Sequence, residues 1–287
     1  MKFVFWGTPR FAEIVLKELL QAGFKPETVV CNPDRLVGRK KILTPPPVKI
    51  LAEEKGIKVF QPEILDENFI EELKKINPDF FAVAAYAKII PKEILEIPRL
   101  GSIGIHPSLL PDLRGATPIQ TAIIKGYKES GVSLYLMDEK MDHGPILGQK
   151  GVILETKGQK MGYLEAEKAL GEEGGKLIAK ILPDFINGKI EPKEQNHEKA
   201  TFTKKIKTED GLVEIEDLKE ALNGNPEKAK EIEKKILAFN PEPGVYVLNP
   251  KRIKLLEAEI KEEILVLKKI QIEGKKPVEK FSIDIFK

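Results

Sequence analysis

The stretch KFVFWGTPRF, residues 2–11, decides the fold class of this chain. After the lysine comes an apolar run typical of a buried strand. Thr8 then offers a helix N-cap, Pro9 suits the first helical turn, and the following apolar side chains recur at helical spacing until Gly23. A strand that turns directly into a helix begins a βαβ unit, so this stretch predicts an α/β fold.

The same alternation of apolar runs and helical patterns continues to residue 150. We therefore predict a doubly wound, mostly parallel sheet. The predicted strands are Thr28–Asn32, Phe80–Ala85, Ser102–His106 and Val132–Leu136, and the predicted helices lie near Val48–Lys55, Phe69–Ile76 and Pro118–Lys125. A further strand at Gly151–Leu154 and a helix from Tyr163 to Ile186 follow.

The character of the chain changes after residue 200. The segment NPEPG at residues 240–244 is a strong break, and apolar runs with strand character follow it. We expect three parts: a first domain over residues 1–200, a linker and helix over 201–244, and a smaller β domain over 245–287.

Composition excludes several classes of protein. The 287 residues carry 47 Lys and Arg against 45 Asp and Glu, so the net charge of +2 selects no partner. No apolar run reaches the roughly 18 residues of a membrane span. The single Cys31 excludes an intrachain disulfide framework and a cysteine-based zinc site. We expect a cytoplasmic, globular monomer that needs no metal.

Few residues carry recognisable chemistry. The turn at Gly7 lacks the second and third glycines of a dinucleotide-binding loop. His106 ends a predicted strand, where ligands of open α/β sheets bind, but a lone histidine is more often structural. Asp142 could orient such a histidine, and it fits a solvated turn equally well.

Together, these segments resemble a known family. The matching motifs are IGIHPSLLP at 103–111, RGA at 114–116, PIQ at 118–120 and MDEKMDHG at 137–144. They are similar to the formyltransferases that use 10-formyltetrahydrofolate. The resemblance implies a catalytic domain over residues 1–200 and a shortened OB-like domain at the C-terminus. It assigns catalysis to His106 and Asp142, with Gly104 at the position of the family's asparagine, and folate binding to Ser108, Leu109, Leu110, Pro111, Tyr86 and Ala87.

A basic loop distinguishes two branches of this family. Residues 33–50 carry a net charge of +4 and include Arg35, Arg39, Lys40 and Lys41. Such a cluster suits a phosphate backbone, although it can also be plain solvated surface. It resembles the insertion that meets the acceptor stem of tRNA. The resemblance thus implies formyl transfer from 10-formyltetrahydrofolate to the methionyl amine of initiator tRNA, with sugar-nucleotide N-formylation as the alternative.

Gly104 is the main departure from the family. Glycine lacks the amide that would donate to the formyl oxygen, so a folate- and tRNA-binding variant without turnover is a further alternative. Restoring the amide by Gly104→Asn is expected to raise turnover about 10²–10³-fold. We also expect Ser108–Pro111 to line a cleft whose other wall includes residues near Ala85–Ile90 and Met137–Asp142, because all three segments follow strand ends of one sheet.

Overall fold

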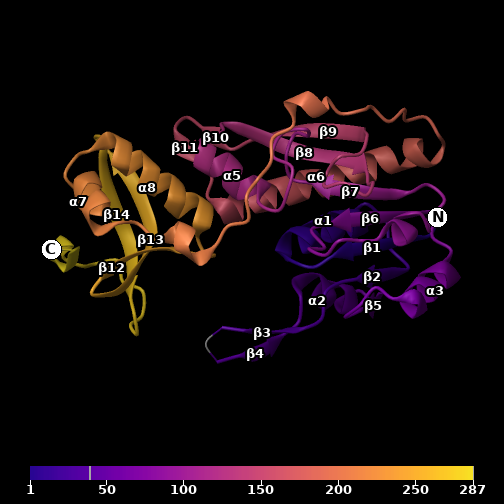
Figure 1. The fold of residues 1–287 in the computed structure, drawn as a ribbon, viewed down its shortest axis with the longest axis horizontal. Coiled ribbons are helices and arrows are strands. Elements are labelled where there is room, and N and C mark those ends of the chain that lie inside the picture. Colours follow the sequence, from indigo (N-terminus) through magenta and orange to yellow (C-terminus); the bar gives the residue numbers. More distant parts are fainter. Residues whose placement is uncertain (39, 287) are drawn as a thin grey trace. The chain divides into compact units, whose positions relative to one another are not determined.

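The computed structural model describes residues 1–38 and 40–286, which form two compact units (Figure 1). The first unit comprises residues 1–116, 129–153 and 167–202. The second comprises residues 117–128, 154–166 and 203–287. The second unit therefore takes two short segments from the middle of the chain as well as its C-terminal part.

A seven-stranded sheet forms the centre of the first unit. Its strand order is β5-β2-β1-β6-β7-β8-β9, which Figure 1 shows from bottom to top. The strands are β1 (Phe3–Gly7), β2 (Thr28–Val30), β5 (Lys58–Phe60), β6 (Phe80–Ala84), β7 (Ser102–His106), β8 (Glu129–Leu136) and β9 (Ile146–Ile153). The first five strands in this order pair in parallel. Strand β8 pairs antiparallel with both of its neighbours, β7 and β9. The chain winds outward from β1 in both directions, which confirms the predicted doubly wound, mostly parallel sheet.

Helices pack on this sheet through apolar stripes. They are α1 (Arg10–Gln21), α2 (Pro47–Glu54), α3 (Glu67–Ile76), α4 (Lys92–Leu95) and the part of α6 (Tyr163–Ile186) that follows Ala166. A Cβ added at Gly174 of α6 would lie 3.0 Å from Ile105 and 3.3 Å from Val132, so this helix packs closely against β7 and β8. Since successive strand residues point to opposite faces, α6 covers the face opposite His106.

Two local predictions near the N-terminus need correction. Pro9, rather than Thr8, occupies the N-cap of α1, and the Thr8 hydroxyl instead accepts hydrogen bonds from the backbone and side-chain nitrogens of Asn32. The segment expected as a polar loop contains an antiparallel hairpin, β3 (Arg35–Val37) and β4 (Ile42–Thr44). Its strands were missed because all six residues are exposed, so no face alternates between buried and polar.

The second unit combines a small sheet with helices. Its sheet is antiparallel in the order β12-β13-β14, with β12 (Val245–Asn249), β13 (Lys251–Lys261) and β14 (Ile264–Ile272), close to the predicted strands. The other elements are α5 (Pro118–Lys125), α7 (Ile215–Leu222), α8 (Pro226–Phe239), the two-residue strands β10 (Glu155–Thr156) and β11 (Gln159–Lys160), and the first residues of α6. Three short 3₁₀ turns complete the chain, η1 (His197–Lys199) in the first unit and η2 (Thr208–Gly211) and η3 (Ile283–Phe286) in the second.

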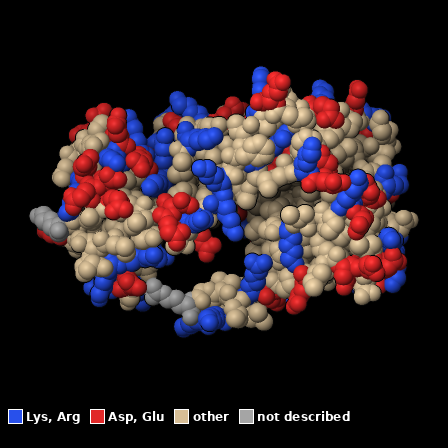
Figure 2. Space-filling view, viewed as in Figure 1, with Lys and Arg blue, Asp and Glu red and all other residues tan. Residues whose placement is uncertain are grey.

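The surface in Figure 2 intersperses basic and acidic side chains over both units. This mixture agrees with the near-zero net charge of the chain. Over residues 1–38 and 40–286, no helix combines the length and the apolar character needed to cross a bilayer.

Candidate active site

Strands β7 and β8 place several polar side chains on one face of the sheet. Gly104 pairs with Tyr135, and His106 pairs with Ser133. Alternate residues of a strand share a face, and so do residues directly opposite each other in an antiparallel pair. His106, Ser133 and Tyr135 therefore project from the face on which a side chain at residue 104 would lie.

His106 lies beside Asp142 on this face. Its ring is 6% exposed, and its Nδ1 is 3.6 Å from Oδ2 of Asp142. Its Nε2 lies 2.9 Å from the carbonyl oxygen of Leu113. A carbonyl oxygen only accepts, so Nε2 carries a proton in this contact, and Nδ1 is the nitrogen that faces the carboxylate. The structure thus brings together the two residues that the resemblance assigns to catalysis.

Asp142 is held by donors from separate parts of the first unit. Its Oδ1 accepts a hydrogen bond of 2.7 Å from the Tyr135 hydroxyl, and its Oδ2 accepts one of 2.7 Å from the backbone N–H of Gly115. Its backbone has φ of 49°, in the left-handed region. These contacts fix the carboxylate with one oxygen toward the imidazole.

The route of the chain to Asp142 differs from the prediction. Because β8 runs antiparallel to β7, the segment after β8 starts at the edge where β7 begins, and Met137 N–H donates to the Ser102 carbonyl oxygen. The loop then folds back over the sheet face until Asp142 reaches Tyr135. The segment therefore reaches His106 by folding back from the opposite edge of the sheet, whereas residues 85–90 and 108–111 follow the parallel strands β6 and β7.

The space beside Gly104 is occupied. A Cβ built on Gly104 would lie 2.4 Å from Cε1, 2.5 Å from Cζ and 2.8 Å from the hydroxyl oxygen of Tyr135. The phenol ring is 4% exposed and its hydroxyl is bonded to Asp142, so the ring cannot simply swing into solvent. Gly104→Asn would therefore require Tyr135 to move, a cost that the expected gain in turnover does not include.

Tyr135 keeps its proton. Burial raises the pKa of its hydroxyl well above the usual value, and the neighbouring carboxylate of Asp142 raises it further. The phenol is therefore a hydrogen-bond donor at all physiological pH values, and Asp142 accepts from it.

A buried network that the sequence did not reveal supports the Asp142 loop. Arg114 is 3% exposed, and it donates to Oε1 of Gln195 through Nε and Nη2 and to Nδ1 of His197 through Nη2. The Gln195 amide donates in turn to the carbonyl oxygens of Asp142 and Gly144. Arg114 lies in the quoted motif. Gln195 and His197 lie outside regular strands and α-helices, and no sequence pattern pointed to them.

The predicted folate loop is tightly anchored to the sheet. The Ser133 hydroxyl donates to the carbonyl oxygen of Ser108 and accepts from the backbone N–H of Leu110, at 2.7 and 2.9 Å. Ser108 and Leu110 are buried, whereas Leu109 and Pro111 are partly exposed. The loop therefore presents alternate residues outward on a rigid base.

Tyr86 lies in a hydrophobic core cluster of the first unit. Its ring is 2% exposed, and it packs edge-on against Trp6 at 5.0 Å between ring centroids, within the core cluster under β1 and β6. Burial raises the pKa of its hydroxyl to about 12. Ala87 is exposed and has φ of 65°, a conformation that favours glycine. The described contacts of Tyr86 do not include His106 or Asp142, so its predicted folate role would fall to this backbone segment.

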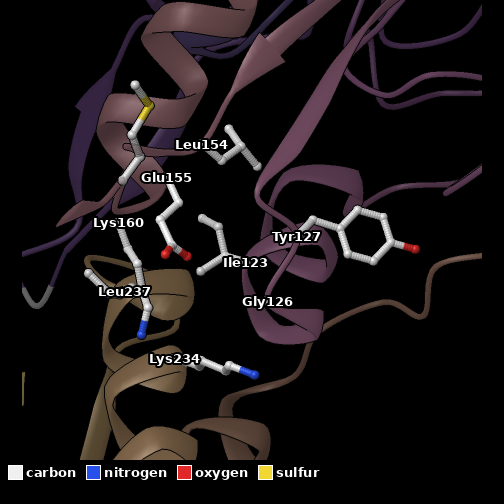
Figure 3. Close-up of a pocket in the computed structure, with 9 residues that line it drawn as sticks. Ile123, Gly126, Tyr127, Leu154, Glu155, Lys160, Lys234 and Leu237 are labelled. Carbon is white, nitrogen blue, oxygen red and sulfur yellow. The ribbon is translucent and has the colours of Figure 1, made fainter. Parts of the chain in front are cut away.

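Other reactive groups do not extend this site. Cys31 is buried, and burial raises the pKa of its thiol to about 12, so it supplies no thiolate nucleophile. Within the described residues, no group of three or more His, Cys, Asp or Glu side chains is placed to hold a metal ion. A small pocket in the second unit, between α5, β11 and α8, contains none of the predicted site residues (Figure 3). The chemistry of the chain therefore centres on β7 and β8.

Three of the four predicted tRNA-binding residues lie on the β3–β4 hairpin. Arg35, Lys40 and Lys41 are exposed, and Arg39 lies outside the described residues. Basic side chains are visible on this hairpin in Figure 2. The hairpin also exposes large apolar side chains, with exposed fractions of 52–62%: Leu36, Val37, Ile42 and Leu43. At its base Lys49 pairs with Asp34 at 3.0 Å, so Lys49 does not add to the free positive charge at the tip.

Comparison with known proteins decides the family. The family described as formyl transferase matches residues 1–172. The chain belongs to this family. The relatives that match this formyltransferase include the methionyl-tRNA formyltransferase of Bacillus cytotoxicus, which is 42% identical over 247 residues, or 86% of this chain and 74% of the relative.

Solved structures share the fold of this formyltransferase at low identity. The methionyl-tRNA formyltransferase from Clostridium thermocellum matches with a TM-score of 0.60 and 19% identity, over 95% of this chain and 98% of that one. An N-formyltransferase from Helicobacter canadensis, solved with folinic acid and dTDP-3-aminofucose, matches with a TM-score of 0.62 and 20% identity, over 96% of both chains. The methionyl-tRNA enzymes are thus the relatives by sequence, whereas the sugar enzyme shares the fold.

Proposed function

We propose that this chain transfers a formyl group from 10-formyltetrahydrofolate to the methionyl amine of initiator tRNA. The observation that carries this proposal is the 42% identity to a methionyl-tRNA formyltransferase over 86% of the chain. The buried contact between His106 and Asp142 supports the proposal, because these are the residues to which the family resemblance assigns catalysis. We expect the protein to act in the cytoplasm.

Formyl-folate supplies the one-carbon group, and the anchored loop over residues 108–111 offers it a rigid wall. Leu109 and Pro111, the partly exposed residues of the loop, would contact the flat heterocycle. The apolar character and the fixed backbone of this wall fit such a ligand. Tyr86 and Ala87 would contribute through their backbone.

His106 and Asp142 perform the chemistry in this proposal. In this proposal His106 keeps its Nε2 contact with the Leu113 carbonyl and acts as a hydrogen-bond donor to the formyl oxygen as negative charge develops there. Asp142 holds the ring by charge at 3.6 Å and receives, through water, the proton that the attacking amine loses. As the new C–N bond to the methionyl amine forms, the bond between the formyl carbon and N10 of the folate breaks, and N10 takes up the proton, so no covalent bond to the protein is required.

A turnover assay with Met-tRNA and 10-formyltetrahydrofolate tests the proposal. His106→Ala should lower kcat by about 10²–10³-fold with little change in KM for the folate, because the missing donor acts mainly in the transition state. The control is Lys74→Ala. Lys74 is an exposed residue of α3 that pairs with Glu71 at 2.9 Å, and its replacement should leave kcat near the original value.

The second candidate function is N-formylation of a nucleotide-linked amino sugar. The fold shared with the Helicobacter canadensis enzyme favours it. A dTDP-amino sugar in the same assay separates the two. Turnover of the sugar without turnover of Met-tRNA would replace the proposal, and no turnover of either substrate would favour a binding protein.

A further inference from the structure

Gly104 and Tyr135 occupy one space. They are direct partners across β7 and β8, and the phenol ring leans over Gly104 until a Cβ there would lie 2.4 Å from it. Only glycine is compatible with the ring in this position. The tyrosine at residue 135 can therefore adopt this position only because residue 104 has no side chain.

The tyrosine brings a polar group to that space. Its hydroxyl lies 2.8 Å from the position of the missing Cβ and donates to Oδ1 of Asp142 at 2.7 Å. The other carboxylate oxygen faces His106. The phenol therefore contacts Asp142 from the space that a side chain at residue 104 would occupy.

We propose that Tyr135 is a positioning residue of this active site, which occupies the side-chain space of residue 104 and holds Asp142 in its place beside His106. This inference rests on the proposed function for the activity it predicts. It changes the meaning of Gly104: the glycine accommodates the phenol and is no sign of a silenced enzyme.

The surroundings suit this role. The charged and titratable groups around the hydroxyl are Asp142, Asp138, Arg114 and His106. The remaining oxygen of Asp142 is bonded to the Gly115 N–H, so removal of the phenol would leave the carboxylate with one of its two side-chain hydrogen bonds. A carboxylate held at both oxygens keeps one orientation, which transfer of a proton requires.

Tyr135→Phe tests the polar part of the proposal, because it keeps the ring and removes the hydroxyl. We expect kcat to fall about 10–100-fold, the range for a hydrogen bond to a charged group, while KM for the folate and the melting temperature stay close to the original values. Equal kcat in both proteins, when the original chain formylates Met-tRNA, would overturn the inference and leave the proposed function intact.

Exchange of the pair tests the shared space. Gly104→Asn alone should lower stability and kcat, since the amide displaces the phenol. Gly104→Asn with Tyr135→Val nearly conserves the volume of the pair, and it should recover both quantities. The matched control is Gly104→Leu with Tyr135→Val, in which leucine has the branched shape of asparagine without its amide. This control should recover stability but not kcat, whereas recovery of kcat in it would reduce Tyr135 to a packing residue.

Two measurements keep the inference testable if no formyl transfer is found. In a double-mutant cycle, the effects of Gly104→Asn and Tyr135→Val on thermal unfolding should be strongly non-additive, as for residues in contact. In a crystal structure of the Tyr135→Phe protein, the Asp142 carboxylate should rotate away from His106 or take two conformers. Additive effects, or an unmoved Asp142, would contradict the proposal whatever the activity.

Discussion

At the scale of single residues, the site depends on the matching of donors to one carboxylate. Both oxygens of Asp142 accept hydrogen bonds, one from Tyr135 and one from the Gly115 backbone. The backbone N–H only donates, and the protonated phenol could accept from an amide only by turning its own proton away from Oδ1. This position therefore requires a carboxylate, and an amide of the same shape does not satisfy it.

Asp142→Asn tests this requirement. The amide nitrogen would face either the phenol or the Gly115 N–H, so one donor loses its acceptor, and we expect a loss of about 1–3 kcal/mol in the free energy of unfolding. The variant also lacks the charge that receives the amine proton, so kcat should fall by at least about 10²-fold. Denaturant unfolding and turnover measure the two effects. Asp184→Asn, a change on an exposed side chain of α6 that pairs with Lys189 at 3.4 Å, is the control and should alter neither by much.

At the scale of the elements, one serine on β8 fixes the loop after β7. Ser133 is fully buried, and its hydroxyl bonds both Ser108 and Leu110, while the Gln149 amide donates to the same hydroxyl at 2.8 Å. The antiparallel pairing of β7 and β8 places Ser133 directly opposite His106. The same register thus sets both the loop and the catalytic face.

Ser133→Ala should loosen that loop. It leaves the Leu110 N–H and the Ser108 carbonyl without this partner, which costs about 1–3 kcal/mol in the free energy of unfolding. The affinity for folate should fall as well, because the wall at Leu109 and Pro111 loses its rigid base. Ser102→Ala, which removes the buried hydrogen bond to the Leu95 carbonyl, should cost comparable stability without a change in folate affinity. Equal folate affinities in the two variants would show that the loop does not bind the folate.

The β3–β4 hairpin carries a prediction of its own. Replacing Arg35, Lys40 and Lys41 by alanine should weaken tRNA binding, because fewer cations then neutralise the RNA backbone. The slope of log affinity against log salt should fall by about 0.7–0.9 for each phosphate group that the variant no longer binds. The matched control replaces Lys74, Lys75 and Arg99, three exposed cations of the first unit that pair with acidic neighbours. A slope that is unchanged in the hairpin variant, or equally reduced in the control, would mean that the hairpin is ordinary solvated surface.

The elements also show what the sequence could predict. Strand β7 and helices α5 and α6 begin and end at the predicted residues, because apolar periodicity and Pro or Gly boundaries define them. The hairpin was missed because its strands bury neither face. The direction of β8 was missed because an apolar run does not encode its pairing partner. Tyr135 was missed for the same reason, since its proximity to Gly104 follows only from that pairing.

At the scale of the whole molecule, the second unit is assembled from distant segments. Helix α5 lies within the predicted catalytic domain along the chain, yet it packs against α8 in the second unit. Its buried residues include Ile119, Ala122 and Ile123. Around the pocket of Figure 3, Lys160 pairs with Glu233 of α8 at 2.6 Å, which adds a polar contact to the same association. The two compact units therefore do not follow the predicted boundary at residue 200, because α5 belongs to the second unit.

A chain that ends at Phe202 tests this organisation. It would keep α5 but lack α8, so apolar side chains that are buried in the intact protein would face water. At about 1.5–3 kcal/mol for a large apolar side chain, exposure of Ile119 and Ile123 alone removes about 3–6 kcal/mol, comparable with the whole stability of many domains. We expect this fragment to aggregate or to unfold at a much lower temperature than the intact chain.

Two variants of that experiment separate this cause from general damage by truncation. Ile119→Glu with Ile123→Lys places an oppositely charged pair four residues apart on the side of α5 that the truncation exposes. This pair should make the fragment soluble. Addition of residues 203–287 as a separate chain should rescue the unaltered fragment, because α8 can then cover α5 again, but it should not rescue the charged one. A fragment that is monomeric and melts at the temperature of the intact chain without either change would show instead that residues 1–200 fold on their own.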